Sequence, residues 1–236
     1  MKIPVIFEND DFVVVNKPIG LAVQDEANNR GILPLLQTQL NIPKLWLVHR
    51  LDKVTSGLLM LAKNADSASR LSQYFAQRQM QKYYLALSNN KPKKKQGAVV
   101  GDMRKIRDGK WALSTSKSNP AIGQFFSCSV EANTRLFVIR PHTGKTHQLR
   151  VMLKSLSSPI LGDVMYTGTK ADRTYLHAYG LQFEDDGYFH RFTCMPQQGN
   201  LFQCATWQQQ HPEFFSPWDL SWPKVPSIGQ SRDCGK

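Results

Sequence analysis

His49, Arg50 and Asp52, three residue types suited to chemistry, stand within four positions of one another. The apolar run from Leu58 to Ala62 follows shortly afterwards and directly succeeds a glycine, which is typical of a strand buried on both faces. Charged groups at the mouth of such a strand need partners, because an unpaired buried charge is costly. Spacing alone leaves two interpretations equal: a structural ion pair that closes the sheet edge, or a carboxylate held at a cleft beside an arginine.

Other chemically equipped segments accompany this one in a definite order along the chain. They are Asn16-Lys17-Pro18-Ile19-Gly20-Leu21, His49-Arg50-Leu51-Asp52 with Thr55-Ser56-Gly57, Lys82-Tyr83-Tyr84-Leu85-Ala86, His142-Thr143-Gly144-Lys145-Thr146-His147-Gln148-Leu149-Arg150-Val151, Pro159-Ile160-Leu161-Gly162-Asp163, Tyr166 and Leu176-His177-Ala178. Together they resemble the motifs of the RluA-type RNA pseudouridine synthases and span residues 16–178, most of the chain. The resemblance implies an isomerase that detaches uracil from its ribose within an RNA chain, rotates the base and rejoins it through carbon, without a cofactor.

The resemblance also implies roles for individual residues. Asp52 corresponds to the catalytic carboxylate, and Arg150 to the cation that pairs with it and favours its ionised form. Strand alternation puts Tyr83 and Tyr84 on opposite faces, and the resemblance selects Tyr84 as the residue that stacks on the target uracil and relays a proton. Arg50 is expected to help extrude the target nucleotide, which costs a few kcal/mol of stacking and pairing.

Further residues are expected to bind the substrate or the RNA around it. Leu149 either lines the uracil pocket or is plain core, and Lys17 supports the cleft. The complete set of expected binding residues is Arg50, His49, Leu149, Lys17, Thr55, Lys93, Lys94 and Lys95.

The charge balance favours a polyanionic partner. The 236-residue chain has 30 basic and 18 acidic residues, a net charge of +12 and a pI near 9.6, which suits RNA but also a merely basic, soluble protein. Within residues 89–120, nine Lys and Arg residues stand against Asp102 and Asp108. We expect a basic loop or hairpin there that contacts RNA, in preference to a hairpin whose lysines only protect an edge strand.

Three other functional classes are weighed against the enzyme. Gly144-Lys145-Thr146 resembles the end of a phosphate-binding loop, but Ile139 stands where that loop requires glycine, so nucleotide hydrolysis is disfavoured. A metal-dependent hydrolase using His142, His147 and His177 is the second alternative, although nothing in their spacing demands a metal. An RNA-binding protein of the same fold that has lost catalysis is the third, and it would not need Asp52, Tyr84 and Arg150. We therefore expect no metal and no nucleotide cofactor.

The resemblance implies an α+β fold, that of the pseudouridine synthase catalytic domain, with a mixed, largely antiparallel sheet flanked by helices, basic loop insertions and a cleft across the middle. Periodicity predicts its elements. Strands are expected over 5–7, 12–15, 58–62, 82–87, 124–130, 134–140, 175–183 and 189–193, and helices over 32–40, 66–80 and 146–156. Asp66 or Ser67 is expected to cap the second helix, and Arg70 and Arg78 to lie on its solvated side. One catalytic domain is expected over residues 1–226, followed by a disordered tail over 227–236.

Cellular setting and target choice follow from simpler features. None of the four cysteines stands in a Cys-x-x-Cys pair, the apolar start is too short for a signal peptide, and no apolar run approaches a membrane span. We expect a cytoplasmic monomer with no membrane partner.

Little sequence precedes Asn16, so we expect a short family member without the N-terminal S4 RNA-binding domain. Its target is then a compact stem-loop in ribosomal or transfer RNA.

Overall fold

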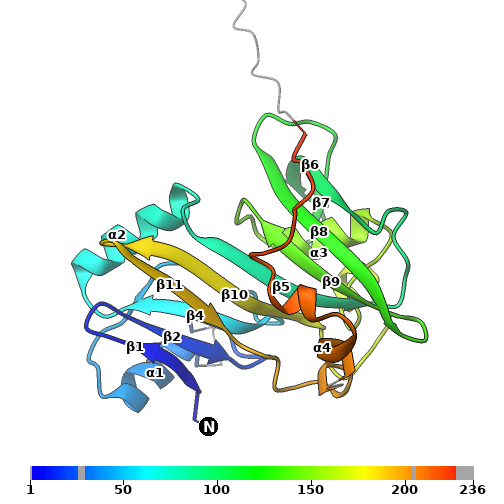
Figure 1. Ribbon diagram of the computed structural model, residues 1–236. Coiled ribbons are helices and arrows are strands. Elements are labelled where there is room, and N and C mark those ends of the chain that lie inside the picture. The colour runs from blue at the N-terminus through cyan, green and yellow to red at the C-terminus, as the bar shows by residue number, and fades with distance from the viewer. Residues whose placement is uncertain (1, 26–29, 204–205, 227–236) are drawn as a thin grey trace, which may run out of the picture.

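The expected strands join in one 11-stranded sheet in the computed structural model, which describes residues 2–25, 30–203 and 206–226 (Figure 1). The strand order is β1-β2-β4-β10-β5-β9-β8-β6-β7, with β11 beside β10 and β3 beside β4. The strands are β1 (Val5–Glu8), β2 (Phe12–Lys17), β3 (Trp46–Leu47), β4 (Ser56–Ala62), β5 (Gln81–Ser88), β6 (Gln96–Lys105), β7 (Trp111–Leu113), β8 (Pro120–Glu131), β9 (Thr134–Pro141), β10 (Leu176–Asp185) and β11 (Tyr188–Thr193). In the described residues only β4 and β10 pair in parallel. The mixed, largely antiparallel α+β fold is thus confirmed.

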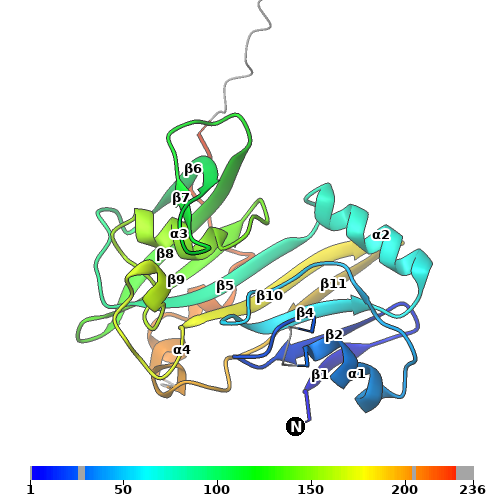
Figure 2. The same ribbon diagram turned by 180° about the vertical axis from the view of Figure 1, so that it is seen from behind.

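The helices flank this sheet. They are α1 (Ile32–Leu40), α2 (Ala65–Ala76), α3 (Gln148–Ser155) and α4 (Thr206–Gln210), with 3-10 turns at η1 (Val164–Tyr166), η2 (Asn200–Gln203) and η3 (Pro212–Phe215). Figure 2 shows α2 and α3 on either side of the central strands β5 and β10. The C-terminal segment, orange to red in Figure 1, crosses the opposite side of the sheet. Among the described residues, no helix has the length and apolar character that crossing a membrane requires.

Strand β4 is the buried strand expected from its apolar run. Leu59 and Leu61 share a core cluster with Ile32 and Leu36 of α1, while Met60 packs with Leu71 of α2 in a second cluster. The alternate side chains of β4 therefore serve two separate cores, which is why the strand has no polar face.

Close approach of β4 to β10 depends on Gly57. Its φ is 108°, and a Cβ there would collide with the backbone of Ala178, its partner in the parallel pair. A glycine at this position therefore holds the start of β4, and the loop before it, against the middle of the sheet.

Helix α2 departs from expectation at both ends. Asn64, rather than Asp66 or Ser67, is the cap, because its side-chain oxygen accepts a hydrogen bond from the Ser67 amide at 2.8 Å. The helix ends at Ala76 instead of residue 80, since Arg78 adopts a left-handed φ of 61°.

Arg70, expected to be solvated, is an ion-pair residue. Its guanidinium lies 3.0 Å from Asp11 and 2.9 Å from Asp185, so it ties α2 to the start of β2 and the end of β10. Arg78 is exposed, as expected.

The basic stretch 89–120 is more regular than a loop. Strands β6 and β7 form a hairpin within it, and β6 pairs along its length with β8. Irregular chain remains over 89–95, 106–110 and 114–119. The hairpin alternative therefore describes its structure better than an unstructured insertion. The expected tail over 227–236 lies outside the described residues.

Candidate active site

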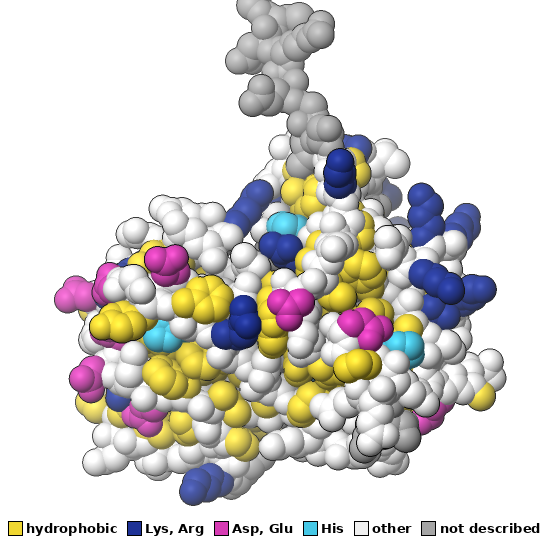
Figure 3. All heavy atoms as spheres, in the orientation of Figure 1, with side chains coloured by type: hydrophobic (Ala, Val, Ile, Leu, Met, Phe, Trp, Pro, Cys, Tyr) yellow, Lys and Arg dark blue, Asp and Glu magenta, His cyan; other side chains and the backbone are white. Residues whose placement is uncertain are grey.

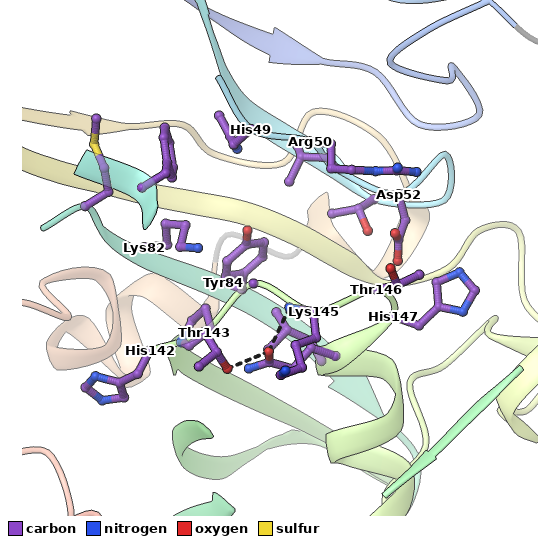
Figure 4. Close-up of a pocket in the computed structure, with 18 of the residues that line it drawn as sticks. His49, Arg50, Asp52, Lys82, Tyr84, His142, Thr143, Lys145, Thr146 and His147 are labelled. Carbon is purple, nitrogen blue, oxygen red and sulfur yellow. Dashed lines mark hydrogen bonds between the residues drawn. The ribbon is translucent and has the colours of Figure 1, made fainter. Parts of the chain in front are cut away.

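A cavity of about 560 Å³ opens between α2 and α3, a volume within the range of small-molecule sites. Its floor is the start of β5, one wall is the loop over residues 48–55 with α2, and the other is the chain over 141–150. Three of the motifs separated in sequence thus meet at one hollow (Figure 4).

The loop that carries Asp52 rests on a buried lysine. Lys17 is fully buried, and its ammonium donates to the carbonyls of Leu21 at 2.7 Å and Lys53 at 3.5 Å. The Thr55 amide donates to the Asp52 carbonyl at 2.9 Å and closes the turn. Burial lowers the pKa of Lys17 to about 7, although the charge of Asp52 opposes the shift. Lys17 and Thr55 thus hold the loop, and Lys17 lies beneath the cavity instead of reaching RNA itself.

Arg150 projects from α3 toward this loop, but Asp163 holds it most closely. Its Nε and Nη2 atoms donate to the two Asp163 oxygens at 2.7 and 2.8 Å. Its remaining nitrogen, Nη1, lies 3.7 Å from Asp52 Oδ2. Arg150 and Asp163 are both buried. Because the two-pronged bond fixes the guanidinium plane, Asp163 presents the free edge of Arg150 to Asp52.

The two tyrosines of β5 lie on opposite faces, as alternation requires. Tyr84 lines the cavity, whereas Tyr83 packs against Trp218 and Trp222 of the C-terminal segment. Burial, with a contribution from the charge of Asp52, raises the pKa of the Tyr84 phenol well above its usual range. The phenol is therefore neutral at physiological pH.

His49 has a structural contact that its position beside Arg50 did not suggest. Its Nε2 accepts a hydrogen bond from the Met60 amide at 2.9 Å, and its ring stacks on Phe75 at 4.4 Å between centroids. Burial, then the charge of Lys82, lowers the pKa of His49 to about 3. The imidazole is thus neutral, and it fixes the loop against β4 and α2.

Arg50 and Leu149 also line the cavity. Arg50 is exposed and extends along the rim in Figure 4, a position from which it can reach RNA. Leu149 is mostly buried, yet part of it faces the hollow, so its two interpretations as pocket wall and core residue are compatible.

Lys93, Lys94 and Lys95 are exposed but stand apart from the cavity. They precede β6, whose first residue pairs with Phe126, whereas Asp102 near its other end pairs with Pro120 beside the cavity residue Asn119. The seven steps from residue 95 to residue 102 cover about 23 Å in a strand. Their contact with RNA stays a prediction, and it requires an RNA that extends well beyond the target nucleotide.

A model of the RNA pseudouridylate synthase family matches residues 11–155. The chain belongs to the RluA-type RNA pseudouridine synthases. The synthase is 53% identical over 204 residues to an uncharacterized RNA pseudouridine synthase of Haemophilus influenzae, covering 86% of this chain and 91% of that protein. It is 35% identical over 188 residues to the ribosomal large subunit pseudouridine synthase C of Rickettsia bellii, covering 73% of this chain and 61% of that longer protein. The synthase is accordingly an isomerase that acts on RNA.

Solved structures agree on the fold. The synthase superposes on human RNA pseudouridylate synthase domain containing 4 with a TM-score of 0.70 and 25% identity, covering 95% of each chain. Human RNA pseudouridylate synthase domain containing 1 gives a TM-score of 0.68 at 23% identity, over 82% of this chain and 83% of that one.

The histidines considered for a metal site bind separate partners. His142 contacts Gln124 at 2.6 Å, His147 contacts Tyr166 at 2.8 Å, and the buried His177 bridges Ser56 and the Cys194 carbonyl. Across the described part of the chain, no three His, Cys, Asp or Glu side chains gather in a metal-binding group.

Three residues in or near the cavity were given no role from sequence: Lys82, which lines it, and Asp163 and Tyr166, which contact Arg150. All stand in segments that match the family motifs, which was the available signal. The Tyr166 hydroxyl accepts from the Trp111 amide at 3.0 Å and contacts His147 Nδ1, and its ring lies 4.8 Å from the Arg150 guanidinium. These roles depend on contacts between distant segments, which residue type alone does not specify.

Proposed function

We propose that the synthase isomerises uridine in a stem-loop of ribosomal or transfer RNA, with Asp52 as its catalytic carboxylate and Tyr84 and Arg150 completing the site. The observation that carries this proposal is their convergence on one cavity: Asp52 and Arg150 are 3.7 Å apart, and Tyr84 lines the same hollow. The name of the Rickettsia bellii relative refers to the large ribosomal subunit, which supports ribosomal RNA as the first substrate to test.

The arrangement suits the isomerisation in a specific way. The reaction breaks the bond between uracil N1 and ribose C1′ and forms one between C5 and C1′, while C5 loses a proton and N1 gains one. Asp52, which lies beside Arg150, would meet the electron-poor C1′ or the base. The neutral phenol of Tyr84 offers a flat surface for the uracil ring, and Arg50 on the rim would occupy or hold the RNA from which the nucleotide has been extruded.

The test maps pseudouridine in total RNA from cells with and without the gene. We expect one or a few sites to lose the modification, and wild type but not Asp52→Ala to restore it. Purified Asp52→Ala should bind the identified RNA with affinity close to wild type while turnover disappears. Asp66→Ala, which removes an exposed carboxylate from the first turn of α2, is the matched control and should restore every site. Turnover by Asp52→Ala at the wild-type rate would refute the assignment.

We also propose that one copy of the chain suffices and that it acts in the cytoplasm. The cavity is lined by segments of a single chain, which supports action as a monomer. Light scattering during gel filtration, with and without RNA, tests the first statement, and fluorescence microscopy of the tagged protein tests the second.

A further inference from the structure

Lys82 is a second polar residue on the cavity floor, two positions before Tyr84. Residues two apart on a strand face the same side, and both line the cavity. Figure 4 shows their side chains rising together from β5, with the Lys82 nitrogen on the Tyr84 side. The ammonium also lies 5.7 Å from the centre of the Phe75 ring.

Two other cations of this hollow are already engaged by protein groups, whereas Arg50 and Arg78 are exposed at its edge. Arg150 binds Asp163 and faces Asp52, and Lys145 donates to Asn119 at 2.9 Å. Within the described ranges, the ammonium of Lys82 has neither a hydrogen bond nor an ion pair. Burial lowers its pKa, so its charged form is costly at this buried position. A negatively charged or carbonyl-bearing ligand would offset that cost.

The positions along the cavity suggest which ligand this is. Figure 4 shows Asp52, Tyr84 and Lys82 in that order across the hollow. If, as proposed above, Asp52 meets the ribose and Tyr84 supports the base, the edge of uracil farthest from the ribose points toward Lys82. That edge bears a carbonyl oxygen.

The chemistry of the reaction then gives this cation a role. When the bond from N1 to C1′ breaks with both electrons left on the base, the uracil anion shares its charge between the O2 and O4 oxygens. Rotation of the ring about the axis through N3 and C6 exchanges N1 with C5 and also O2 with O4. A single cation at the far edge can therefore contact one carbonyl before the rotation and the other after it.

We propose that Lys82 is a catalytic residue that donates a hydrogen bond to the far carbonyl oxygen of the target uracil and stabilises the detached base as an anion. Lys82 keeps its proton throughout. The proton that leaves C5 and the proton that arrives at N1 are carried by other groups. Like a hydrogen-bond donor in an oxyanion hole, Lys82 stabilises negative charge that develops during the reaction. The inference rests on the proposed positions of Asp52 and Tyr84.

The experiment compares Lys82→Met and Lys82→Arg under single-turnover conditions with saturating RNA. Lys82→Met keeps the apolar stem and should lower the saturated rate by about 100-fold or more, as the loss of one oxyanion donor does. Its Kd for the RNA should stay within about twofold of wild type, because an uncharged base gains little from the cation. Lys82→Arg restores the charge and should recover part of the rate. Lys2→Met, which removes one charge outside the cavity, is the control and should match wild type.

Two outcomes would overturn the proposal. An unchanged saturated rate in Lys82→Met would do so, and so would a weakened Kd with a salt slope reduced by about one, the signature of a phosphate contact. Matching melting temperatures of wild type and Lys82→Met establish that the fold is retained. If the two temperatures differ, Lys82→Gln is used in place of Lys82→Met. Asp52→Ala, assayed in parallel, separates the two proposals. If Asp52→Ala retains turnover and Lys82→Met loses it, only the role proposed for Asp52 is refuted.

Discussion

The contact between Asp52 and Arg150 is longer than the contact between Asp163 and Arg150. Asp163 lies 2.7 Å from the guanidinium, against 3.7 Å for Asp52. A carboxylate that must react cannot also be bound tightly by its counter-ion, since a short two-pronged bond would occupy its oxygens. Asp163 therefore takes the strong bond and leaves Asp52 available.

We predict that Asp163→Asn impairs both stability and turnover. Removing one partner of a buried ion pair costs about 3–5 kcal/mol, and the released Arg150 would turn toward Asp52 and engage its oxygens. Urea unfolding should show the stability loss, and single-turnover kinetics at saturating RNA should show a rate reduced at least tenfold.

Asp185→Asn provides the matched control, because Asp185 is also buried and paired with an arginine, Arg70, away from the cavity. It should lower stability while leaving the saturated rate near wild type. Equal rate losses in the two variants would show that Asp163 acts only through stability.

His177 gives the fold an acid-sensitive point. Its two nitrogens contact Ser56 and the Cys194 carbonyl at 2.8 Å, and burial lowers its pKa to about 3. In the unfolded chain an imidazole titrates near 6.5, so below that pH the unfolded state binds more protons. His177 therefore contributes stability that is present above pH 6.5 and is lost as pH falls toward 3.

We predict a melting temperature that falls between pH 6.5 and pH 5, before most carboxylates titrate. The free-energy loss from this imidazole over that interval is about 2 kcal/mol. His177→Gln should be less stable at pH 7 but show a shallower pH dependence, with the remaining slope due to His49, His142 and His147, whose pKa values burial also lowers. A slope as steep as wild type in calorimetric scans would assign the acid sensitivity elsewhere.

At the scale of elements, Tyr166 connects the basic hairpin to the catalytic helix. Its hydroxyl accepts from Trp111 at the start of β7 and contacts His147, the residue before α3. The hydroxyl and His147 Nδ1 share a hydrogen bond of 2.8 Å, in which the tautomer of the imidazole decides which group donates. The position of the hairpin is thereby linked to the helix that carries Arg150.

We predict that Tyr166→Phe loosens this link while keeping the ring. Losing the hydrogen bonds leaves the Trp111 amide without its partner, at a cost of about 1–3 kcal/mol. Hydrogen exchange at Trp111 should accelerate, and the KM for RNA should rise. Tyr188→Phe removes the same atom from a tyrosine that is 74% exposed and should change neither quantity. Unchanged exchange at Trp111 in Tyr166→Phe would contradict the link.

Local patterns predicted the elements well where local forces set them. Helix α1 begins and ends at Ile32 and Leu40 as expected, because its apolar spacing directly determines which face is buried. The predicted end of α2 at residue 80 was wrong, because the residue types around Arg78 give no sign of its left-handed backbone conformation. Strand β6 was not recognised because it is stabilised by pairing with β8, far along the chain.

The candidate site shows the same division. The order of the motifs predicted that Asp52, Tyr84 and Arg150 share one site, and in the structure all three line one cavity. The Asp163 contact with Arg150 depends on how the turn before η1 folds back on α3, and the exposure of Lys82 to the cavity depends on the register of β5 between β9 and β10. Strand alternation puts Lys82 on the same face as Tyr84. Whether its side chain reaches the cavity, like the contact of Asp163 with Arg150, follows from tertiary packing.

At the scale of the molecule, charge is distributed unevenly between the two ends of the sheet. Figure 3 views the side away from the cavity and shows acidic side chains gathered on the left and basic ones along the right edge. Exposed Glu184 and Asp186 stand at the turn between β10 and β11. RNA is therefore expected to avoid the β10–β11 turn and to extend from the cavity along β6, over the basic hairpin.

Two groups of basic residues mark the ends of that path. Arg104, Lys105 and Arg107 are exposed near the turn between β6 and β7, beside the cavity, whereas Lys93, Lys94 and Lys95 stand at the other end of β6. We predict that neutralising the first group weakens binding of every active substrate and reduces the salt slope by about two to three, since each lost phosphate contact removes roughly 0.7–0.9.

Neutralising Lys93, Lys94 and Lys95 should act only on longer substrates. A ten-residue strand such as β6 covers roughly 33 Å, so a minimal stem-loop held at the cavity ends before it reaches them. Binding of short and extended versions of the target RNA, measured across a salt series, separates the two groups. A weaker affinity for the minimal stem-loop in the Lys93–Lys95 variant would mean that the RNA enters from that end. An unchanged affinity and salt slope on both lengths would assign those lysines to solubility, leaving the hairpin beside the cavity to hold the RNA.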